Sequence, residues 1–218
     1  MSLLIKICGL KTPDALDAAL QAGADMVGFV FFAPSPRHLD IEAARALGVR
    51  VKGRARKVAL SVNASDAELE AVVEALKPDM LQFHGKEPPE RVVAMRSRFQ
   101  LPVMKALPIE QKADLAAIRS YQDVADWLLF DGRAPRDATR PGGLGKPFDW
   151  GLLRNLDLKI PFMLSGGLDA SNVGEALAVA RAPAVDVSSG VERAPGEKDA
   201  DKIRAFIRAA RAADTVTA

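Results

Sequence analysis

Short apolar runs recur along the whole chain, and a longer stretch of mixed polarity separates each run from the next. The runs are rich in Val, Ile, Leu and Phe and are too short to be helices. We therefore interpret them as strands that are buried on both faces of a parallel sheet. They lie at residues 3–8, 25–31, 57–62, 79–83, 102–107, 126–131, 161–165 and 184–189.

The stretches between the runs show helical periodicity and helix start signals. Thr12 before Pro13 predicts an N-cap and a first-turn proline. Ser65 with Glu68 predicts a capping box. Comparable patterns predict further helices that begin after Asp40 and after Pro88 and that cover 111–120, 149–156, 171–181 and 199–213. Each predicted strand is thus followed by a predicted helix.

This alternation predicts the fold. Eight strand and helix units in 218 residues average about 27 residues each, close to the ~31 residues per unit of a typical (β/α)8 barrel. An open doubly wound sheet is the alternative, but it usually has about five or six strands. We predict an α/β fold, a (β/α)8 TIM barrel that forms a single domain over residues 1–218. The one long irregular segment, 132–147, follows the sixth strand, and long loops in compact domains are usually functional or disordered.

Charge and cysteine content restrict the partners and the compartment. The chain has 30 Lys and Arg against 28 Asp and Glu, and the basic residues are spread along it, so no nucleic-acid partner is expected. The single cysteine, Cys8, excludes a disulfide within the chain and fits a reducing compartment. The N-terminus lacks signal-peptide features, and no apolar run approaches the ~20 residues of a membrane span. We expect a cytoplasmic protein without a membrane partner, and a monomer rather than a homodimer.

In a barrel of this kind the active site lies at the carboxyl ends of the strands. Cys8 ends the first predicted strand and is followed by a glycine. A lone cysteine is usually a small buried apolar residue, but a thiolate at this position could act as a base or a nucleophile. Asp131 ends the sixth predicted strand after four apolar residues, which is an expensive place for a carboxylate unless it caps a loop or transfers protons.

Small residues follow the last two strands, where barrels commonly bind phosphate. Gly166 and Gly167 follow the seventh strand, and Ser189 and Gly190 follow the eighth. Glycines let main-chain N–H groups approach an oxyanion, although turn formation is their simpler explanation. The segment 142–145, which includes Gly143 and Gly145, is either a flexible linker, a lid or a third phosphate contact.

Other polar residues at the mouth leave their roles open. Arg37 lies in a proline-stiffened loop, and its planar guanidinium suits carboxylate recognition. His84 is either a polar substrate contact or a helix-capping imidazole, and the two histidines lack the acidic neighbours of a metal site. Lys6 and Lys105 lie within strands. Lys6 shares a strand face with Cys8. It either forms a structural ion pair, supplies a cation that favours the thiolate, or acts as a Schiff-base lysine.

Seven motifs lie at the ends of the predicted strands or in the loops after them: KICGL at 6–10, GFVFFAPSPR at 28–37, QFHGKE at 82–87, FD at 130–131, GGLGKPFDW at 142–150, LSGGLDASNV at 164–173 and VDVSSGVE at 185–192. Together they resemble the phosphoribosylanthranilate isomerases of tryptophan biosynthesis, and the resemblance covers nearly the whole chain. The resemblance implies a (β/α)8 barrel that needs no metal and no organic cofactor. It also implies an Amadori-type isomerisation of a phosphorylated small molecule, N-(5-phosphoribosyl)anthranilate, to 1-(2-carboxyphenylamino)-1-deoxyribulose 5-phosphate.

The resemblance also implies roles for individual residues. Cys8 matches the general base, Asp131 the general acid, and Arg37 the arginine near the anthranilate carboxylate. The Gly166–Gly167 and Ser189–Gly190 loops match the phosphate site, to which the segment from Gly143 to Gly145 contributes. The chain departs from the family pattern at Leu144, where a hydroxyl residue is expected, and in the longer segment 133–141.

The chemistry sets conditions on the pair. Asp131 has to carry a proton to open the furanose ring, and Cys8 has to be ionised to remove the C2′ proton, so their environments have to push the two pKa values apart. Three other functions remain. An isomerase of histidine biosynthesis uses carboxylates for both transfers, a Schiff-base aldolase needs Lys6 or Lys105, and a phosphate-binding barrel without activity needs neither Cys8 nor Asp131.

Overall fold

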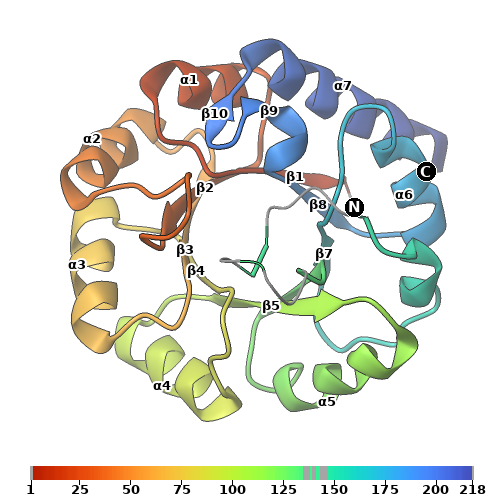
Figure 1. The fold of residues 1–218 in the computed structure, drawn as a ribbon, viewed down its shortest axis with the longest axis horizontal. Helices are drawn as coiled ribbons and strands as arrows, with labels where there is room; N and C mark the ends of the chain where they lie inside the picture. Colours follow the sequence, from red (N-terminus) through yellow and green to blue (C-terminus); the bar gives the residue numbers. More distant parts are fainter. Residues whose placement is uncertain (1, 135–137, 139–140, 143–146, 218) are drawn as a thin grey trace.

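The structure is a computed structural model that describes residues 2–134, 138, 141–142 and 147–217. Eight parallel strands form a closed barrel in sequence order, which confirms the predicted fold (Figure 1). Each strand begins within one residue of its predicted start. The assignment of all 218 residues to one domain stays a prediction. The strands are β1 (Leu4–Cys8), β2 (Met26–Phe31), β3 (Arg56–Ser61), β4 (Met80–Phe83), β5 (Val103–Ile109), β6 (Trp127–Gly132), β7 (Phe162–Leu164) and β8 (Ala184–Val187).

Helices surround the barrel (Figure 1). They are α1 (Pro13–Gln21), α2 (Ile41–Val51), α3 (Asp66–Leu76), α4 (Pro89–Phe99), α5 (Ile118–Tyr121), α6 (Val173–Ala180) and α7 (Ala200–Thr217). The predicted caps are present: the Thr12 side chain accepts a hydrogen bond from Ala15 N, and Ser65 and Glu68 form the capping box. Within the described ranges, no helix is long and apolar enough to cross a membrane.

Two of the predicted helices differ from the structure. The stretch 149–156 forms only a 3₁₀ turn, η2 (Trp150–Leu153), in place of the helix that was predicted there. Gly151 weakens helix formation. The turn ends at Arg154, whose main chain is extended, and Asn155 follows in a left-handed conformation with φ of 62°. The stretch after β5 is mostly a 3₁₀ helix, η1 (Lys112–Ala117), that leads into the short α5.

A small hairpin that the sequence did not predict follows β8. A 3₁₀ turn, η3 (Ser189–Val191), leads into β9 (Glu192–Ala194), which pairs with β10 (Glu197–Lys198) in antiparallel orientation. The turn contains Gly196 at φ of 81°, and a Cβ there would lie 2.3 Å from the carbonyl oxygen of Pro36. The hairpin therefore packs against the loop after β2, which carries Arg37.

The barrel interior changes character along its axis. At the amino ends of the strands it is filled by a cluster that includes Met26, Met80, Met104 and Met163. Nearer the carboxyl ends the buried side chains become polar and include Lys6. A separate, larger apolar cluster fills the layer between the strands and the helices. The apolar end makes the barrel a packed core, and the polar end is where chemistry can be placed.

Candidate active site

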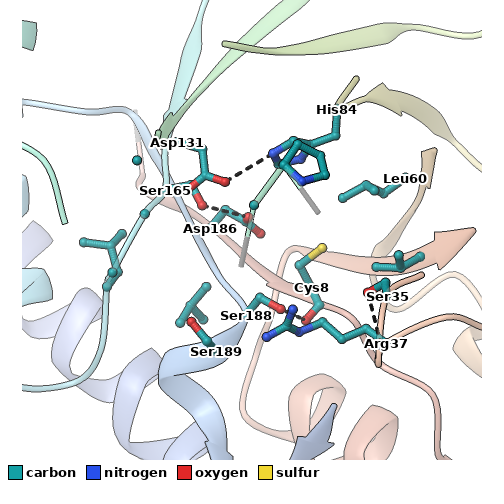
Figure 2. A pocket seen from close by; sticks show the side chains of 18 of the residues that line it. Cys8, Ser35, Arg37, Leu60, His84, Asp131, Ser165, Asp186, Ser188 and Ser189 are labelled. Carbon is teal, nitrogen blue, oxygen red and sulfur yellow. Dashed lines mark hydrogen bonds and ion pairs between the residues drawn. The ribbon is translucent and has the colours of Figure 1, made fainter. Parts of the chain in front are cut away.

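One cavity opens at the carboxyl ends of the strands. It encloses about 760 Å³ of empty space, including the part open to solvent. Cys8 of β1 and Asp131 of β6 both line it, and the close-up shows the thiol and the carboxyl group turned toward the same space (Figure 2). Arg37, His84 and the loops after β7 and β8 line it as well. The barrel thus brings most of the predicted site residues to one place.

The Cys8 thiol lies in an apolar niche at the edge of this cavity. Its exposed fraction is 3%, and it packs against Val30 and Leu60. A Cβ at Gly28 on the neighbouring strand would lie 2.8 Å from the sulfur, so only glycine leaves room for the thiol there. The niche fixes the side chain and keeps water away from it.

A buried ion pair lies in the barrel interior beside Cys8. Lys6 Nζ donates to Asp186 Oδ1 at 2.9 Å, and Ser165 Oγ donates to Asp186 Oδ2 at 3.1 Å. Burial acts to lower the pKa of Lys6, but the Asp186 carboxylate and Cys8 outweigh it, so the pKa of the amine is raised. Lys6 is therefore a fixed cation next to the thiol, which agrees with two of the three roles that the sequence allowed.

The electrostatic balance at Cys8 favours the thiol. Burial raises the pKa of Cys8 above its ordinary value of 9.0, because a thiolate in the apolar niche is poorly solvated. Lys6 and Lys198 both act to lower this pKa, whereas Asp186 acts to raise it. The two lysines thus reduce the cost of ionising Cys8 without removing it.

Asp131 is held by a histidine. His84 Nε2 lies 3.2 Å from Asp131 Oδ2 (Figure 2). His84 Nδ1 lies 3.3 Å from the side-chain nitrogen of Gln82. Gly142 covers this pair so closely that a Cβ there would lie 2.4 Å from Asp131 Oδ2. His84 therefore contacts the carboxyl group directly, and it does not serve as a helix cap: α4 begins after Pro88, which forms no side-chain cap.

The loops after β7 and β8 approach each other at the mouth, and the loop after β7 lies beside Asp131: a Cβ at Gly166 would lie 3.1 Å from Asp131 Oδ1. Gly166 and Gly167 adopt φ values of 88° and 65° and line the cavity together with Ser189. Within the described part of the chain, the N–H groups of both glycines are free of hydrogen bonds. Gly190 is not among the described residues that line the cavity, because it packs on the neighbouring loop, where a Cβ would lie 1.9 Å from Leu168 O. Gly143 and Gly145 lie outside the described residues.

Arg37 is part of a buried charge cluster with the hairpin. Its Nε and Nη2 donate to the two carboxylate oxygens of Glu192 at 2.7 and 2.9 Å. Lys198 Nζ donates to Glu192 at 2.7 Å and to the Ser188 carbonyl oxygen at 2.8 Å. Burial lowers the pKa of Lys198 to about 8, although Glu192 opposes this shift. The sequence placed Arg37 at the mouth but gave no indication that Glu192 holds its guanidinium.

The second strand lysine lies elsewhere. Lys105 Nζ donates to Glu87 Oε2 at 2.9 Å and to Gly85 O at 2.7 Å, in the loop after β4. Neither Lys105 nor Lys6 is among the described residues that line the cavity. An aldolase that forms a Schiff base through either lysine therefore has no support from the geometry.

Comparison with known proteins decides the family. The sequence matches the family profile of N-(5'-phosphoribosyl)anthranilate (PRA) isomerase over residues 5–209. The chain belongs to this family. Curated PRA isomerases resemble it along their full length: one from Bradyrhizobium sp. (strain ORS 278) is 62% identical over 217 residues, which cover 100% of this chain and 99% of that protein. Another, from Nitrobacter winogradskyi, is 63% identical over 215 residues, 99% of this chain and 96% of that protein.

Solved PRA isomerases have the same fold. The crystal structure of the Thermotoga maritima enzyme is 35% identical with a TM-score of 0.86, over 96% of this chain and 99% of that one. A PRA isomerase in complex with reduced 1-(o-carboxyphenylamino)-1-deoxyribulose 5-phosphate is 32% identical with a TM-score of 0.83, over 96% of this chain and 99% of that one. The resemblance that the motifs indicated is thereby confirmed at the level of the family.

The sequence patterns did not identify several polar residues of this PRA isomerase site. Asp186 was assigned only to an apolar run, although a carboxylate in the middle of a buried strand is a signal for an ion pair. Gln82 was noticed only within a motif. Glu192 and Lys198 belong to a hairpin whose strands have three and two residues, too short for a period-two pattern. Glu192 was included only as the last residue of the motif VDVSSGVE, and the turn dipeptide at 195–196 was the only local signal for the hairpin.

Proposed function

We propose that Cys8 and Asp131 are the base and the acid with which this chain carries out the reaction of its family. That reaction converts N-(5'-phosphoribosyl)anthranilate to 1-(2-carboxyphenylamino)-1-deoxyribulose 5-phosphate. The observation that carries the assignment is a thiol and a carboxyl group, from β1 and β6, that line one cavity. A protein that only binds phosphate has no need for this pair.

The proposed sequence of steps balances its protons. Asp131 donates a proton to the ring oxygen, the bond between that oxygen and C1′ breaks, and the nitrogen lone pair forms an iminium. The Cys8 thiolate then removes the acidified C2′ proton, and the electron pair neutralises the iminium to give an enolamine. Tautomerisation moves the proton of the C2′ hydroxyl group to C1′ and yields the ketone. Transfer of a proton from Cys8 back to Asp131 through solvent then restores both groups. Each proton-transfer group of this kind typically contributes ~10²–10⁴-fold to the rate.

The thiolate form of Cys8 needs electrostatic stabilisation from nearby lysines. Because burial raises the pKa of Cys8, the thiolate is the minor form near neutral pH. Lys6 is fully buried, and its ion pair with Asp186 fixes it beside the thiol. We assign to Lys6 and Lys198 the electrostatic role of keeping the thiolate accessible. Both remain positioning residues, since neither is among the described residues that line the cavity.

The two charged ends of the substrate have separate places in this proposal. The N–H groups of Gly166 and Gly167, which form no hydrogen bond with the described residues, suit a phosphate, together with Ser189 on the adjacent loop. Gly190 serves by allowing the two loops to meet, and Gly143 and Gly145 keep their predicted role beyond the described residues. Arg37 suits the anthranilate carboxylate, with Glu192 orienting its planar guanidinium.

Substrate fluorescence tests the assignment. Wild-type protein should abolish the fluorescence of phosphoribosylanthranilate. Cys8→Ser and Asp131→Asn, which keep size and polarity, should each lower kcat by ~10²–10⁴-fold or more with little change in stability. If Cys8→Ser stays active, the base is another group. If Asp131→Asn keeps full activity, another acid opens the ring. Activity on the phosphoribosyl substrate of histidine biosynthesis, without activity here, would favour that related isomerase.

Assembly and compartment are further proposals. One solved relative consists of monomers generated from the dimeric phosphoribosylanthranilate isomerase of Thermotoga maritima. We nevertheless propose a monomer, because Val49 on α2 and Val93 on α4 are the only large exposed hydrophobic residues in the described part of the chain, and α3 lies between them (Figure 1). Light scattering at micromolar concentration would refute this by reporting twice the chain mass. We also propose a cytoplasmic location, which a biosynthetic reaction and a single free thiol support.

A further inference from the structure

Gln82 is a buried polar residue for which the proposed mechanism has no role. It lies on β4 with an exposed fraction of 0% and pairs in register with Leu60, which lines the cavity. Its side chain therefore points into the barrel interior, below His84. The amide nitrogen lies 3.3 Å from His84 Nδ1, and the amide oxygen has no hydrogen-bond partner among the described residues.

This contact determines which ring nitrogen of His84 carries the proton. An amide nitrogen only donates, so Nδ1 has to accept and the proton has to lie on Nε2. Nε2 is the atom that lies 3.2 Å from Asp131 Oδ2, so its N–H group points at the carboxyl oxygen. The reversed amide would leave a buried NH₂ group without a partner, which is rarer in proteins than an unpaired carbonyl oxygen.

We propose that Gln82 is a positioning residue that holds His84 in the Nε2–H tautomer, so that His84 donates a hydrogen bond to the Asp131 carboxylate. This inference rests on the proposed role of Asp131 as the general acid. When Asp131 gives its proton to the ring oxygen, negative charge develops on the oxygen that Nε2–H faces. A hydrogen bond to a developing charge is stronger than one to the neutral acid and therefore promotes ring opening.

The geometry makes the donor ready before the reaction. Gly142 closes the space over both partners, with a hypothetical Cβ 2.7 Å from His84 Nε2. The main chain of His84 is fixed to β3 by a hydrogen bond from its N–H group to Ser61 O at 2.9 Å. The imidazole can thus lose its function by a change of tautomer without any movement of the ring.

The direct test is nuclear magnetic resonance of ¹⁵N-labelled histidine. The chain has two histidines, and His38→Gln, at an exposed position, assigns the remaining signals to His84. The wild-type protein should show an unprotonated Nδ1 and a protonated Nε2. A protonated Nδ1 would overturn the inference. Because no substrate is needed, this result is independent of whether Cys8 and Asp131 are the catalytic pair.

Variants connect the tautomer to the reaction. Gln82→Met keeps the volume but removes the donor, so the tautomers should mix and kcat should fall about tenfold, the worth of one hydrogen bond, with little change in KM. Gln82→Glu offers Nδ1 an acceptor instead, so the proton should move to Nδ1 and kcat should fall further. Gln21→Met, at an exposed position of α1, is the control and should change neither the His84 signals nor kcat.

The outcomes separate the two proposals. If the tautomer in Gln82→Met is unchanged, or if it mixes while kcat stays at the wild-type value, Gln82 has no positioning role and the Cys8–Asp131 assignment stands. If Asp131→Asn is fully active, the acid assignment fails even where His84 shows the expected tautomer.

Discussion

At the scale of single residues, Cys8 shows how a barrel balances opposing demands. The niche formed with Val30 and Leu60 fixes the thiol but penalises its ionisation, and Lys6 offsets part of that penalty from the barrel interior. A base that is mostly protonated can still act, because the reaction proceeds through the small fraction of molecules in which Cys8 is a thiolate and its partner acid is protonated. The raised pKa of Cys8 is therefore a property that can be measured directly.

Alkylation with iodoacetamide should report this pKa. The thiolate is the reacting form, and the pKa of Cys8 is raised, so the alkylation rate of the folded protein should still be increasing with pH at pH 9.0, the ordinary value. Because the chain has one cysteine, the modified mass identifies the site.

The urea-unfolded chain provides the control, since its exposed thiol should level off near the ordinary pKa. A folded protein whose alkylation rate levels off well below pH 9.0 would mean that the lysines outweigh burial, contrary to the direction found in the structure.

The Arg37 guanidinium has a structural partner in addition to its proposed substrate contact. The sequence predicted only its location and its suitability for a carboxylate, but the structure shows two hydrogen bonds from its guanidinium to Glu192. Arg37→Lys would lose both the planar contact that we propose with the substrate carboxylate and the bidentate link to Glu192 of the hairpin. A loss of activity in that variant therefore assigns Arg37 to carboxylate binding only if the melting temperature is unchanged.

At the scale of elements, strands were predictable and connections were not. The eight strands are buried runs of apolar residues, and their composition alone located β1 and β6, which end at the proposed base and close to the proposed acid. The helix predicted over 149–156 does not form, because Gly151 and Asn155 outweigh a weak helical periodicity. The hairpin β9–β10 depends on a contact with the loop after β2, which is a long-range feature that no local pattern records.

The loop after β4 is held by a buried ion pair, and this yields a prediction. Glu87 accepts hydrogen bonds from the N–H groups of Gly85 and Asn63, and Lys105 is its only cationic partner among the described residues. Lys105→Met should lower the free energy of unfolding by about 3–5 kcal/mol, because it leaves a buried carboxylate without its counter-ion. Urea unfolding measures the change.

The double variant Lys105→Met with Glu87→Gln is the matched control. It removes both charges and keeps an oxygen acceptor for the loop, so it should be more stable than Lys105→Met alone. If the double variant is the less stable of the two, the hydrogen bonds of the carboxylate matter more than its charge.

At the scale of the whole molecule, the barrel divides stability and chemistry between its two ends. The methionine-rich cluster at the amino ends of the strands contains no member that lines the cavity among the described residues. The carboxyl ends carry buried polar groups such as Lys6 and Asp186, which add little to stability relative to apolar packing. Changes at one end should therefore leave the function of the other end intact.

Met104 tests this division. It lies on β5 with an exposed fraction of 0% and packs within the cluster at the amino ends. Met104→Ala should lower the free energy of unfolding by about 2–5 kcal/mol, because it removes buried methylene groups and leaves a cavity. Its kcat/KM at a temperature where the protein is folded should match the wild type, since the cavity at the carboxyl ends is unchanged. Val93→Ala on α4, 45% exposed, should change stability by no more than about 0.5 kcal/mol. If Met104→Ala instead loses activity in proportion to its stability, the two ends are coupled through the barrel, and the polar layer between them, with Gln82 and Lys6, is where that coupling has to pass.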